Sequence, residues 1–251
     1  MSENRPFVLT IAGHDPSGGA GILSDIKTFE QHQVYGLAVS TGNTIQTENQ
    51  FHDIQWTDLD FVLDSIKTLF LTYDIKAVKI GIVPSLDYLK KIVHTIKKHS
   101  PKTKIVWDTV LKSTTEFQFT TIKNQMELIE ILQHIDLITP NYNEILKLSE
   151  TKDSAEEIAT KLSIYCSVLL KGGHNPNQKG VDYLYVDKEC AKLVGALVVT
   201  SDKHGSGCVL SSAIAANLVL GHDILLASLK AKNYIEKYLN SNATLLGYHH
   251  V

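Results

Sequence analysis

Cysteine is scarce in this chain of 251 residues, which has only Cys166, Cys190 and Cys208. The three are far apart, odd in number and form no Cys-x-x-Cys pair, so neither a disulfide framework nor a zinc site is expected. No stretch reaches the roughly 18 apolar residues of a membrane span, and residues 1–6 are polar, without the apolar core of a signal peptide. We therefore expect a cytoplasmic protein with no membrane partner.

An excess of charge of one sign is also lacking. The 24 Lys and Arg residues nearly balance the 27 Asp and Glu residues, which leaves a formal net charge of -3 and no basic tract. Nucleic-acid binding normally leaves a basic patch or stripe, so a nucleic-acid partner is not expected. Linkers and repeats are absent too, and 251 residues are enough for one large α/β core. We therefore expect a single domain spanning residues 1–251.

Strand-like and helix-like segments alternate along nearly the whole chain. Strands are predicted at residues 7–11, 34–40, 75–80, 105–108, 137–139 and 167–171, with a hairpin at 181–186 and 190–199. Helices are predicted near residues 22–29, 58–70, 85–99, 128–134, 141–144, 154–166, 209–220 and 223–239, and residues 41–47 are predicted as a polar loop. Asn141 is the expected N-cap of the helix that begins there. This alternation is typical of an α/β fold with a doubly wound, mainly parallel sheet between two helical layers.

A glycine-rich stretch, Thr200 to Cys208, lies between a strand-like and a helix-like run. Gly205 and Gly207 allow a tight turn and leave room for a ligand, and the N–H groups at the start of the helix would attract phosphate. Cys208 falls in the first turn, where the pKa of a thiol tends to be lowered, and is a candidate base. An ordinary strand-to-helix turn with a buried cysteine is about equally consistent with this stretch alone.

A second glycine-rich stretch runs from Gly13 to Gly21 after the first strand. It is not a Walker A loop, because no Lys-Ser/Thr pair follows the glycines, and it lacks the Gly-x-Gly-x-x-Gly spacing. A tight turn is one explanation. Five consecutive small residues exceed what a turn needs, however, so a close approach of the backbone to a ligand is favoured.

Polar or glycine residues follow most of the predicted strands, where open α/β sheets bind ligands. These residues are Asp15, Gln46, Gly81, Asp108, Asn141, Lys171 and Gly205. Phosphoryl transfer suits such a set, because it depends on positioning and charge stabilisation.

In that chemistry, Lys171 would pair with phosphate oxygens, and Asp108 and Glu144 would hold Mg²⁺. The cradle Gly205–Cys208 would stabilise the transferred group, with Cys208 as general base. Each residue has a simpler explanation: a helix cap for Asp108, a helix-dipole contact for Glu144 and a solvated strand end for Lys171.

Other polar and aromatic residues suggest how a substrate would be bound. The amide of Gln46 can donate and accept, which suits the edge of a heterocycle, although hydrogen bonding within its loop is the alternative. Trp56 and Trp107 are either stacking surfaces or core residues. His204 lies next to the cradle, within reach of a phosphate, whereas the pair 249–250 is expected to be a loose tail.

Six motifs occur together and in order. They are Ile11–Gly21 (Ile-Ala-Gly-His-Asp-Pro-Ser-Gly-Gly-Ala-Gly), Lys79-Ile80-Gly81, Asp108-Thr109-Val110, Ile138–Asn141 with Glu144, Leu170–His174, and His204-Gly205-Ser206-Gly207-Cys208. Because of these motifs, the chain resembles the hydroxymethylpyrimidine/phosphomethylpyrimidine kinases of thiamine biosynthesis, which belong to the ribokinase-like superfamily. The resemblance extends over nearly the whole chain. The resemblance implies a ribokinase-like α/β sandwich, often dimeric, that uses ATP and Mg²⁺ to phosphorylate the pyrimidine hydroxymethyl group and then the monophosphate.

The resemblance also assigns roles by position. Gln46 matches the glutamine that binds the pyrimidine. Gly13, Ala20, Asp25 and Val110 match other positions of the substrate pocket. Asn141, Glu144 and Lys171 match the side that binds the nucleotide and magnesium. Gly205, Ser206 and Gly207 match the cradle. Cys208 stands where sugar-kinase relatives carry an aspartate base.

The chain departs from the family pattern at several positions. His14 replaces Ser or Thr, Ile82 replaces Met, and Ser206 replaces Thr, while residues 111–119 lack the Gly/Asp-containing flap that covers the nucleotide. A pyridoxal kinase on the same scaffold and a catalytically silent pyrimidine-binding member therefore remain as alternatives. Gln46 favours the pyrimidine, and the intact cradle argues against a silent member.

Overall fold

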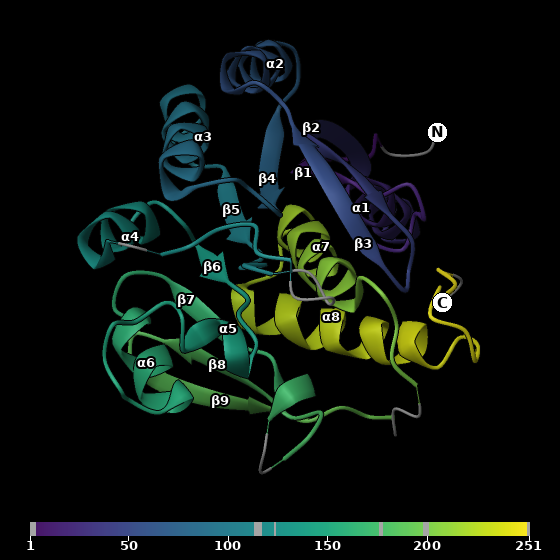
Figure 1. Ribbon diagram of the computed structural model, residues 1–251, viewed down its shortest axis with the longest axis vertical. Helices are drawn as coiled ribbons and strands as arrows, with labels where there is room; N and C mark the ends of the chain where they lie inside the picture. The colour runs from purple at the N-terminus through teal and green to yellow at the C-terminus, as the bar shows by residue number, and fades with distance from the viewer. Residues whose placement is uncertain (1–3, 113–116, 123, 176–177, 198–200, 250–251) are drawn as a thin grey trace.

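A single mixed sheet runs through the computed structural model, which describes residues 4–112, 117–122, 124–175, 178–197 and 201–249 (Figure 1). Within these residues the strand order is β3-β2-β1-β4-β5-β6-β7-β8-β9. The strands are β1 (Phe7–His14), β2 (Tyr35–Gln46), β3 (Phe51–Trp56), β4 (Ile75–Ile80), β5 (Lys104–Trp107), β6 (Leu137–Ile138), β7 (Ser167–Leu170), β8 (Asp182–Val186) and β9 (Glu189–Leu193). The helices are α1 (Gly21–Gln31), α2 (Leu59–Thr72), α3 (Leu86–His99), α4 (Gln125–Leu132), α5 (Tyr142–Ile145), α6 (Ala155–Leu162), the 3₁₀ turn η1 (Gly172–His174), α7 (Ser206–Val219) and α8 (Ile224–Leu239).

The central strands are parallel and the outer ones antiparallel. β1 pairs in parallel with both β2 and β4, and the parallel pairing continues through β5 and β6 to β7. β3, β8 and β9 join as antiparallel strands at the two edges. The predicted doubly wound, mainly parallel sheet is confirmed. The strand order reverses at β1 and β4, so ligands are expected beyond the carboxyl ends of these strands.

Two apolar cores lie on opposite faces of the sheet and make the fold three-layered. Leu9 and Ile11 of β1 belong to the core covered by α2, α3, α4 and α6. Val8 belongs to the other core, which α1, α7 and α8 cover. Figure 1 shows α7 and α8 lying side by side across the middle of the sheet. No helix in the described part of the chain is long and apolar enough to cross a membrane.

Most helices begin with a side-chain cap, but the two nearest the glycine-rich segments do not. Asp58, Ser85, Asn124 and Asp223 accept hydrogen bonds from the first-turn N–H groups of α2, α3, α4 and α8. In contrast, α1 begins after Ala20 and α7 after Gly205 without a side-chain cap. Their first turns are therefore not closed by a side-chain oxygen, although the Ser206 N–H donates to the carbonyl of Lys203 at 3.4 Å.

Two sequence-based predictions about strands were wrong. Residues 41–47 were expected to be a loop, but β2 continues to Gln46 and pairs with the unpredicted strand β3. β3 is partly exposed along its length, so its sequence carries no burial pattern that would reveal a strand. The last hairpin strand was expected to reach Val199 but ends at Leu193, and residues 198–200 lie outside the described residues.

Candidate active site

The two glycine-rich segments pack directly on each other. Gly205 has φ +71°, and a Cβ there would overlap the carbonyl oxygen of Gly19. Gly21 has φ +59°, and its Cβ would overlap the carbonyl oxygen of Gly13. The sequence suggested that these small residues admit a ligand. At Gly21 and Gly205 the close approach is instead to the backbone of the first segment, which only glycine allows.

Asp15 joins the same two segments through its buried carboxylate. It accepts hydrogen bonds from the backbone N–H groups of Ser17 and Ala20, both at 2.9 Å. His204 Nε2 lies 2.9 Å from Asp15 Oδ2. Burial would raise the pKa of Asp15, but these partners hold it below its ordinary value. Ala20, which was predicted to line the substrate pocket, is thus also part of the support of this loop.

The start of α7 faces a cluster of charged side chains. A Cβ on Gly207 would lie 3.3 Å from Lys171 Nζ and 3.6 Å from Asp108 Oδ2. Ser206, Gly207 and Cys208 form the uncapped first turn of α7. The missing side chain of Gly207 therefore leaves space between a helix N-terminus and an ammonium group, which is where an anion would be favoured.

Lys171 bridges two carboxylates in this cluster. Its Nζ lies 3.0 Å from Asp108 Oδ1 and 3.6 Å from Glu144 Oε2. Asp108 is fully buried, and Thr139 Oγ1 donates to it at 3.0 Å. Burial would raise the pKa of Asp108, but the nearby ammonium groups of Lys171 and Lys79 lower it below its ordinary value. Asp108 is therefore an ionised acceptor.

Asn141 and Glu144 form a capping box at the start of α5. The Asn141 side chain accepts from the N–H of Asn143 at 2.8 Å and of Glu144 at 2.9 Å, and Glu144 Oε2 accepts from the N–H of Asn141 at 2.8 Å. The predicted N-cap is confirmed. Burial raises the pKa of Glu144, although Lys171 opposes this shift. The cap fixes the Glu144 carboxylate beside Lys171, so a structural and a ligand-binding role are compatible.

The carboxylates of Asp108 and Glu144 fit a magnesium ion that arrives with a nucleotide. Among the described residues no group of three or more His, Cys, Asp or Glu side chains is placed to hold a metal. Proteins usually bind Mg²⁺ through one or two carboxylates together with substrate phosphates and water. Asp108 and Glu144 are such a pair of carboxylates, and the Lys171 ammonium group lies between them.

Cys208 is half-buried in the first turn of α7, and its thiol does not behave as expected. The helix N-terminus was expected to lower its pKa, but burial raises it to about 11. The Lys79 ammonium and the backbone N–H of Gly21 act in the opposite direction and favour the thiolate. Desolvation outweighs both, so Cys208 is a neutral thiol in the free protein.

A buried ion pair beneath the cradle was missed from the sequence. Lys79 Nζ lies 2.9 Å from Asp25 Oδ2, and both side chains are fully buried. Thr10 Oγ1 and Ser212 Oγ donate to the same carboxylate at 2.5 and 2.6 Å. Asp25 has no exposed surface left for a substrate, so its expected role changes from pocket residue to support. Ser212 lies one helical turn after Cys208, which places the pair under the thiol.

The remaining predicted pocket residues come from neighbouring strand ends. Gly13 is the next-to-last residue of β1 and lies close to Ile82, whose Cδ1 would be 2.5 Å from a Cβ at Gly13. Gln46 ends β2 opposite Phe51 of β3 and is half-buried. Val110 follows β5 and is also half-buried, and its N–H donates to the carbonyl of Asp108. These residues lie at the carboxyl end of the parallel strands, as expected for a site there.

The described part of residues 111–119, the segment that lacks the family's flap pattern, lies against the β2–β3 hairpin. Residues 113–116 are outside the described residues. Beyond them, the ring of Phe117 lies 4.6 Å and that of Phe119 5.3 Å from the ring of Phe51. Trp56 meets Phe119 edge to face at 6.3 Å, whereas Trp107 is buried in the core. The described part of the segment therefore contacts the hairpin that carries Gln46.

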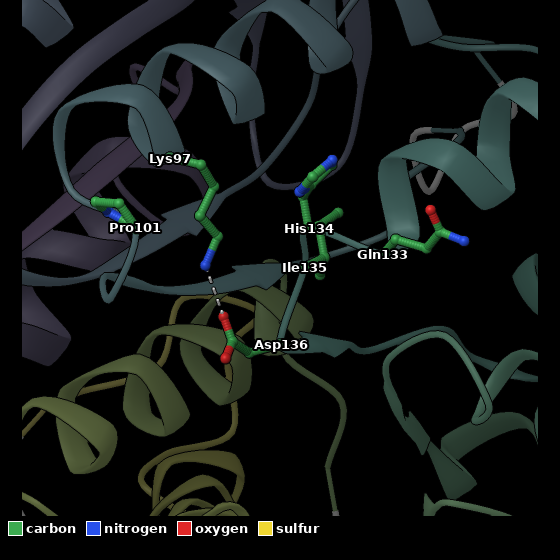
Figure 2. A pocket seen from close by; sticks show the side chains of 6 residues that line it. All are labelled: Lys97, Pro101, Gln133, His134, Ile135 and Asp136. Atoms are coloured by element: carbon green, nitrogen blue, oxygen red, sulfur yellow. Dashed lines mark hydrogen bonds and ion pairs between the residues drawn. The ribbon is translucent and has the colours of Figure 1, made fainter.

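A cavity of about 280 Å³ lies at the opposite end of the sheet (Figure 2). Its lining includes Pro101 and the ion pair of Lys97 with Asp136. Pro101 and Asp136 precede β5 and β6, whereas Asp108 and Thr139 follow these strands. None of the predicted site residues lines this cavity, and we do not assign it to the active site.

The comparisons with known proteins agree with this geometry. The chain matches the sequence profile described as phosphomethylpyrimidine kinase over residues 15–251. It belongs to the phosphomethylpyrimidine kinase family. Among its relatives are the hydroxymethylpyrimidine/phosphomethylpyrimidine kinases of Aquifex aeolicus, 33% identical over 95% of this chain and 96% of the relative, and of Escherichia coli, 30% identical over 84% and 82%.

Solved structures of the family and of a related kinase share the fold. The phosphomethylpyrimidine kinase of Clostridium difficile is 30% identical, with a TM-score of 0.78 over 93% of this chain and 99% of that one. An ADP complex of Bacillus subtilis pyridoxal kinase is 29% identical, with a TM-score of 0.79 over 94% and 92%. The predicted ribokinase-like α/β fold and kinase activity are thus supported by relatives that span nearly the full chain.

Proposed function

We propose that this chain is one kinase domain that uses ATP to phosphorylate 4-amino-5-hydroxymethyl-2-methylpyrimidine and then its monophosphate, in the cytoplasm, as a step of thiamine biosynthesis. Family membership supports the substrate class. The observation that carries the chemistry is the juxtaposition of the uncapped start of α7, at Gly207, with Lys171 and Asp108. A helix N-terminus and a fixed ammonium group stabilise the charge that develops on a transferred phosphoryl group.

In this proposal one set of residues binds the transferred phosphoryl group and another set binds Mg²⁺. Lys171 and the N–H groups of Gly207 and Cys208 hold the transferred group. Mg²⁺, held by Asp108 and Glu144, would neutralise phosphate charge. Asn141 keeps Glu144 in place through the capping box.

Cys208 takes the proton of the substrate hydroxyl. Because its thiol is neutral in the free protein, it must first release its own proton to water, and the charge of Lys79 and the N–H of Gly21 favour that loss. Gln46 would read the edge of the pyrimidine, and Gly13 and Val110 would shape the pocket beside it. Asp25 acts behind the pocket by keeping Lys79 in place.

ATP consumption by the purified protein tests the proposal. The assay contains Mg²⁺ and, separately, hydroxymethylpyrimidine, its monophosphate and pyridoxal. We expect turnover of both pyrimidines and no turnover after Mg²⁺ is removed by chelation. Binding of the pyrimidine without ATP consumption would instead identify a catalytically silent member.

Pyridoxal kinase is the second candidate function, because the Bacillus subtilis pyridoxal kinase is similar to this chain over nearly its whole length. Turnover of pyridoxal alone would select this candidate and would remove the role proposed for Gln46. We also propose a homodimer, which light scattering on the purified protein would test. A monomeric mass at assay concentrations would refute it.

A further inference from the structure

Lys203 is a buried lysine just before the cradle, and it binds the C-terminal part of the chain. Its side chain is 5% exposed. The ammonium group donates to the carbonyl oxygens of Asn242 at 2.5 Å and Thr244 at 2.7 Å, and to Ser201 Oγ at 3.3 Å. Burial lowers its pKa. A lysine held by neutral oxygens in this way fixes the backbone of residues 242–244 against the loop that leads to Gly205.

The same C-terminal residues touch both glycine-rich segments. The N–H of His204 donates to the carbonyl of Leu245 at 2.9 Å. A Cβ on Gly19 would lie 2.8 Å from both Leu246 Cδ2 and His204 Cδ2, so the Leu246 side chain rests against the first segment. Residues 241–249, which we call the C-terminal brace, therefore contact the loop before α7 and the loop before α1 at once.

The brace has its own internal structure. Asn242 Nδ2 donates to the carbonyl of Leu246 at 2.9 Å, and Asn242 Oδ1 accepts from the N–H of Thr244 at 2.7 Å. These bonds close a compact turn that presents the carbonyl groups to Lys203.

The end of the brace is fixed to α8. Gly247 lies against the ring of Tyr238, since a Cβ there would be 2.5 Å from that ring. The ring of His249 lies 4.8 Å from that of Tyr238, and His249 Nδ1 lies 3.0 Å from Tyr234 Oη. The expectation of a loose tail was wrong for His249, and His250 lies outside the described residues.

We propose that the C-terminal brace positions the start of α7 for phosphoryl transfer, with Lys203 as the positioning residue. The proposal rests on the proposed kinase function. The reason is local: α7 has no side-chain cap, and Gly205 holds a left-handed turn two residues after Lys203. The bonds to the brace hold the loop that leads into the first turn of α7, and a shift of the loop would move the N–H groups of the cradle.

Three variants on the two sides of this contact test the idea. Lys203→Met removes the ammonium group, Asn242→Ala opens the turn of the brace, and the third variant combines both. We expect kcat to fall about 10-fold in each single variant, because misplaced catalytic groups lower the rate, with KM for ATP and for the pyrimidine changed less than twofold. The double variant should be no slower than the slower single variant, since both act through one contact.

Lys97→Met is the matched control. Lys97 is a partly buried lysine that donates to the carbonyl of Thr103 at 2.8 Å, at the opposite end of the sheet. We expect this variant to keep the wild-type kcat even where its unfolding temperature falls as far as that of Lys203→Met. An equal loss of kcat in the control, or an unchanged kcat in Lys203→Met and Asn242→Ala, would overturn the proposal.

Hydrogen exchange gives a readout that does not depend on turnover. In both single variants the amides of residues 204–210 should exchange at least about 10-fold faster than in the wild type, while those of β4 stay protected. Unchanged exchange at residues 204–210 would refute the brace. A wild-type protein that consumes no ATP would refute the proposed function alone, and the exchange result would still decide the role of the brace.

Discussion

Replacing Gly207 by alanine should separate the stability of this protein from its activity. Gly207 is the second residue of α7 and, unlike Gly205, does not have a positive φ. A methyl group there would lie 3.3 Å from Lys171 Nζ and 3.6 Å from Asp108 Oδ2. It would occupy the space that we assign to the transferred phosphoryl group, without disturbing the helix.

The two effects have opposite signs. Alanine is favoured over glycine by up to about 1 kcal/mol within a helix, and near the helix start we expect a gain of about 0.5 kcal/mol after the Lys171 ammonium group has moved slightly. For a chain of this length that raises the unfolding temperature by about 1–2 °C. The rate should fall on the order of 100-fold, the loss typical of a disturbed anion-stabilising group.

The assay is kcat for the pyrimidine, measured beside thermal unfolding, with Gly205→Ala as the comparison. At Gly205 a Cβ would overlap the Gly19 carbonyl oxygen, and alanine would have to adopt φ +71°. We therefore expect Gly205→Ala to lower the free energy of unfolding by on the order of 3 kcal/mol and to abolish activity as well. Wild-type kcat in Gly207→Ala would refute the cradle. A lower unfolding temperature would show that Lys171 cannot move and that part of the loss is structural.

Four further predictions concern single side chains. Cys208→Ala should abolish most of the turnover and leave pyrimidine binding, measured by calorimetry, nearly intact. Gln46→Ala should weaken pyrimidine binding about 10-fold, the effect of one lost hydrogen bond, and leave KM for ATP unchanged. Lys79→Met should lower the free energy of unfolding, measured in urea, by about 3–5 kcal/mol, because the Asp25 carboxylate is left buried and unpaired. Adding Asp25→Asn to this variant should restore part of the lost stability. Burial lowers the pKa of His249 from 6.5 to about 4. As the pH falls, the His249 imidazole therefore binds a proton in the unfolded chain before it does so in the folded protein. The free energy of unfolding should then fall by up to about 3 kcal/mol as the pH drops from about 6.5 to about 4.

Each of these predictions can fail on its own. Wild-type turnover in Cys208→Ala would exclude it as the base, and an unchanged affinity in Gln46→Ala would place the pyrimidine elsewhere. Equal stability of Lys79→Met and the wild type would show that the buried pair is replaceable. If the free energy of unfolding of His249→Asn depends on pH as that of the wild type does, the loss of stability in acid comes from another group.

The sequence predicted the elements whose burial follows a simple pattern. β1, β4 and β7 are short runs of buried aliphatic residues, and α3 buries Leu86, Leu89, Val93 and Ile96 at helical spacing. β3 gave no such signal, because it lies at the sheet edge and is partly exposed along its length. Strands of this kind are recognisable only from their partner.

Long-range contacts account for what the sequence could not supply at the site. Lys79 lies in the buried strand β4, and its partner Asp25 lies 54 residues away, so no local pattern in the sequence links the two. The local argument for Cys208 considered only the helix N-terminus, whereas the surrounding core decides the direction of its pKa shift. The capping role of Asn141 was predicted correctly, because a capping box involves residues only three apart.

The position of α7 in the chain has a consequence for how the protein is made. This helix packs against α1, β1, β4 and β5, yet the ribosome adds it after β9, the last strand of the described residues. Until it emerges, the face of the sheet that carries Val8, Ala77 and Val106 has no cover from it, and the nascent chain has no anion cradle. We expect the unfinished chain to depend on chaperones that shield apolar surface, and nucleotide to stabilise only chains released with α7 and α8 in place.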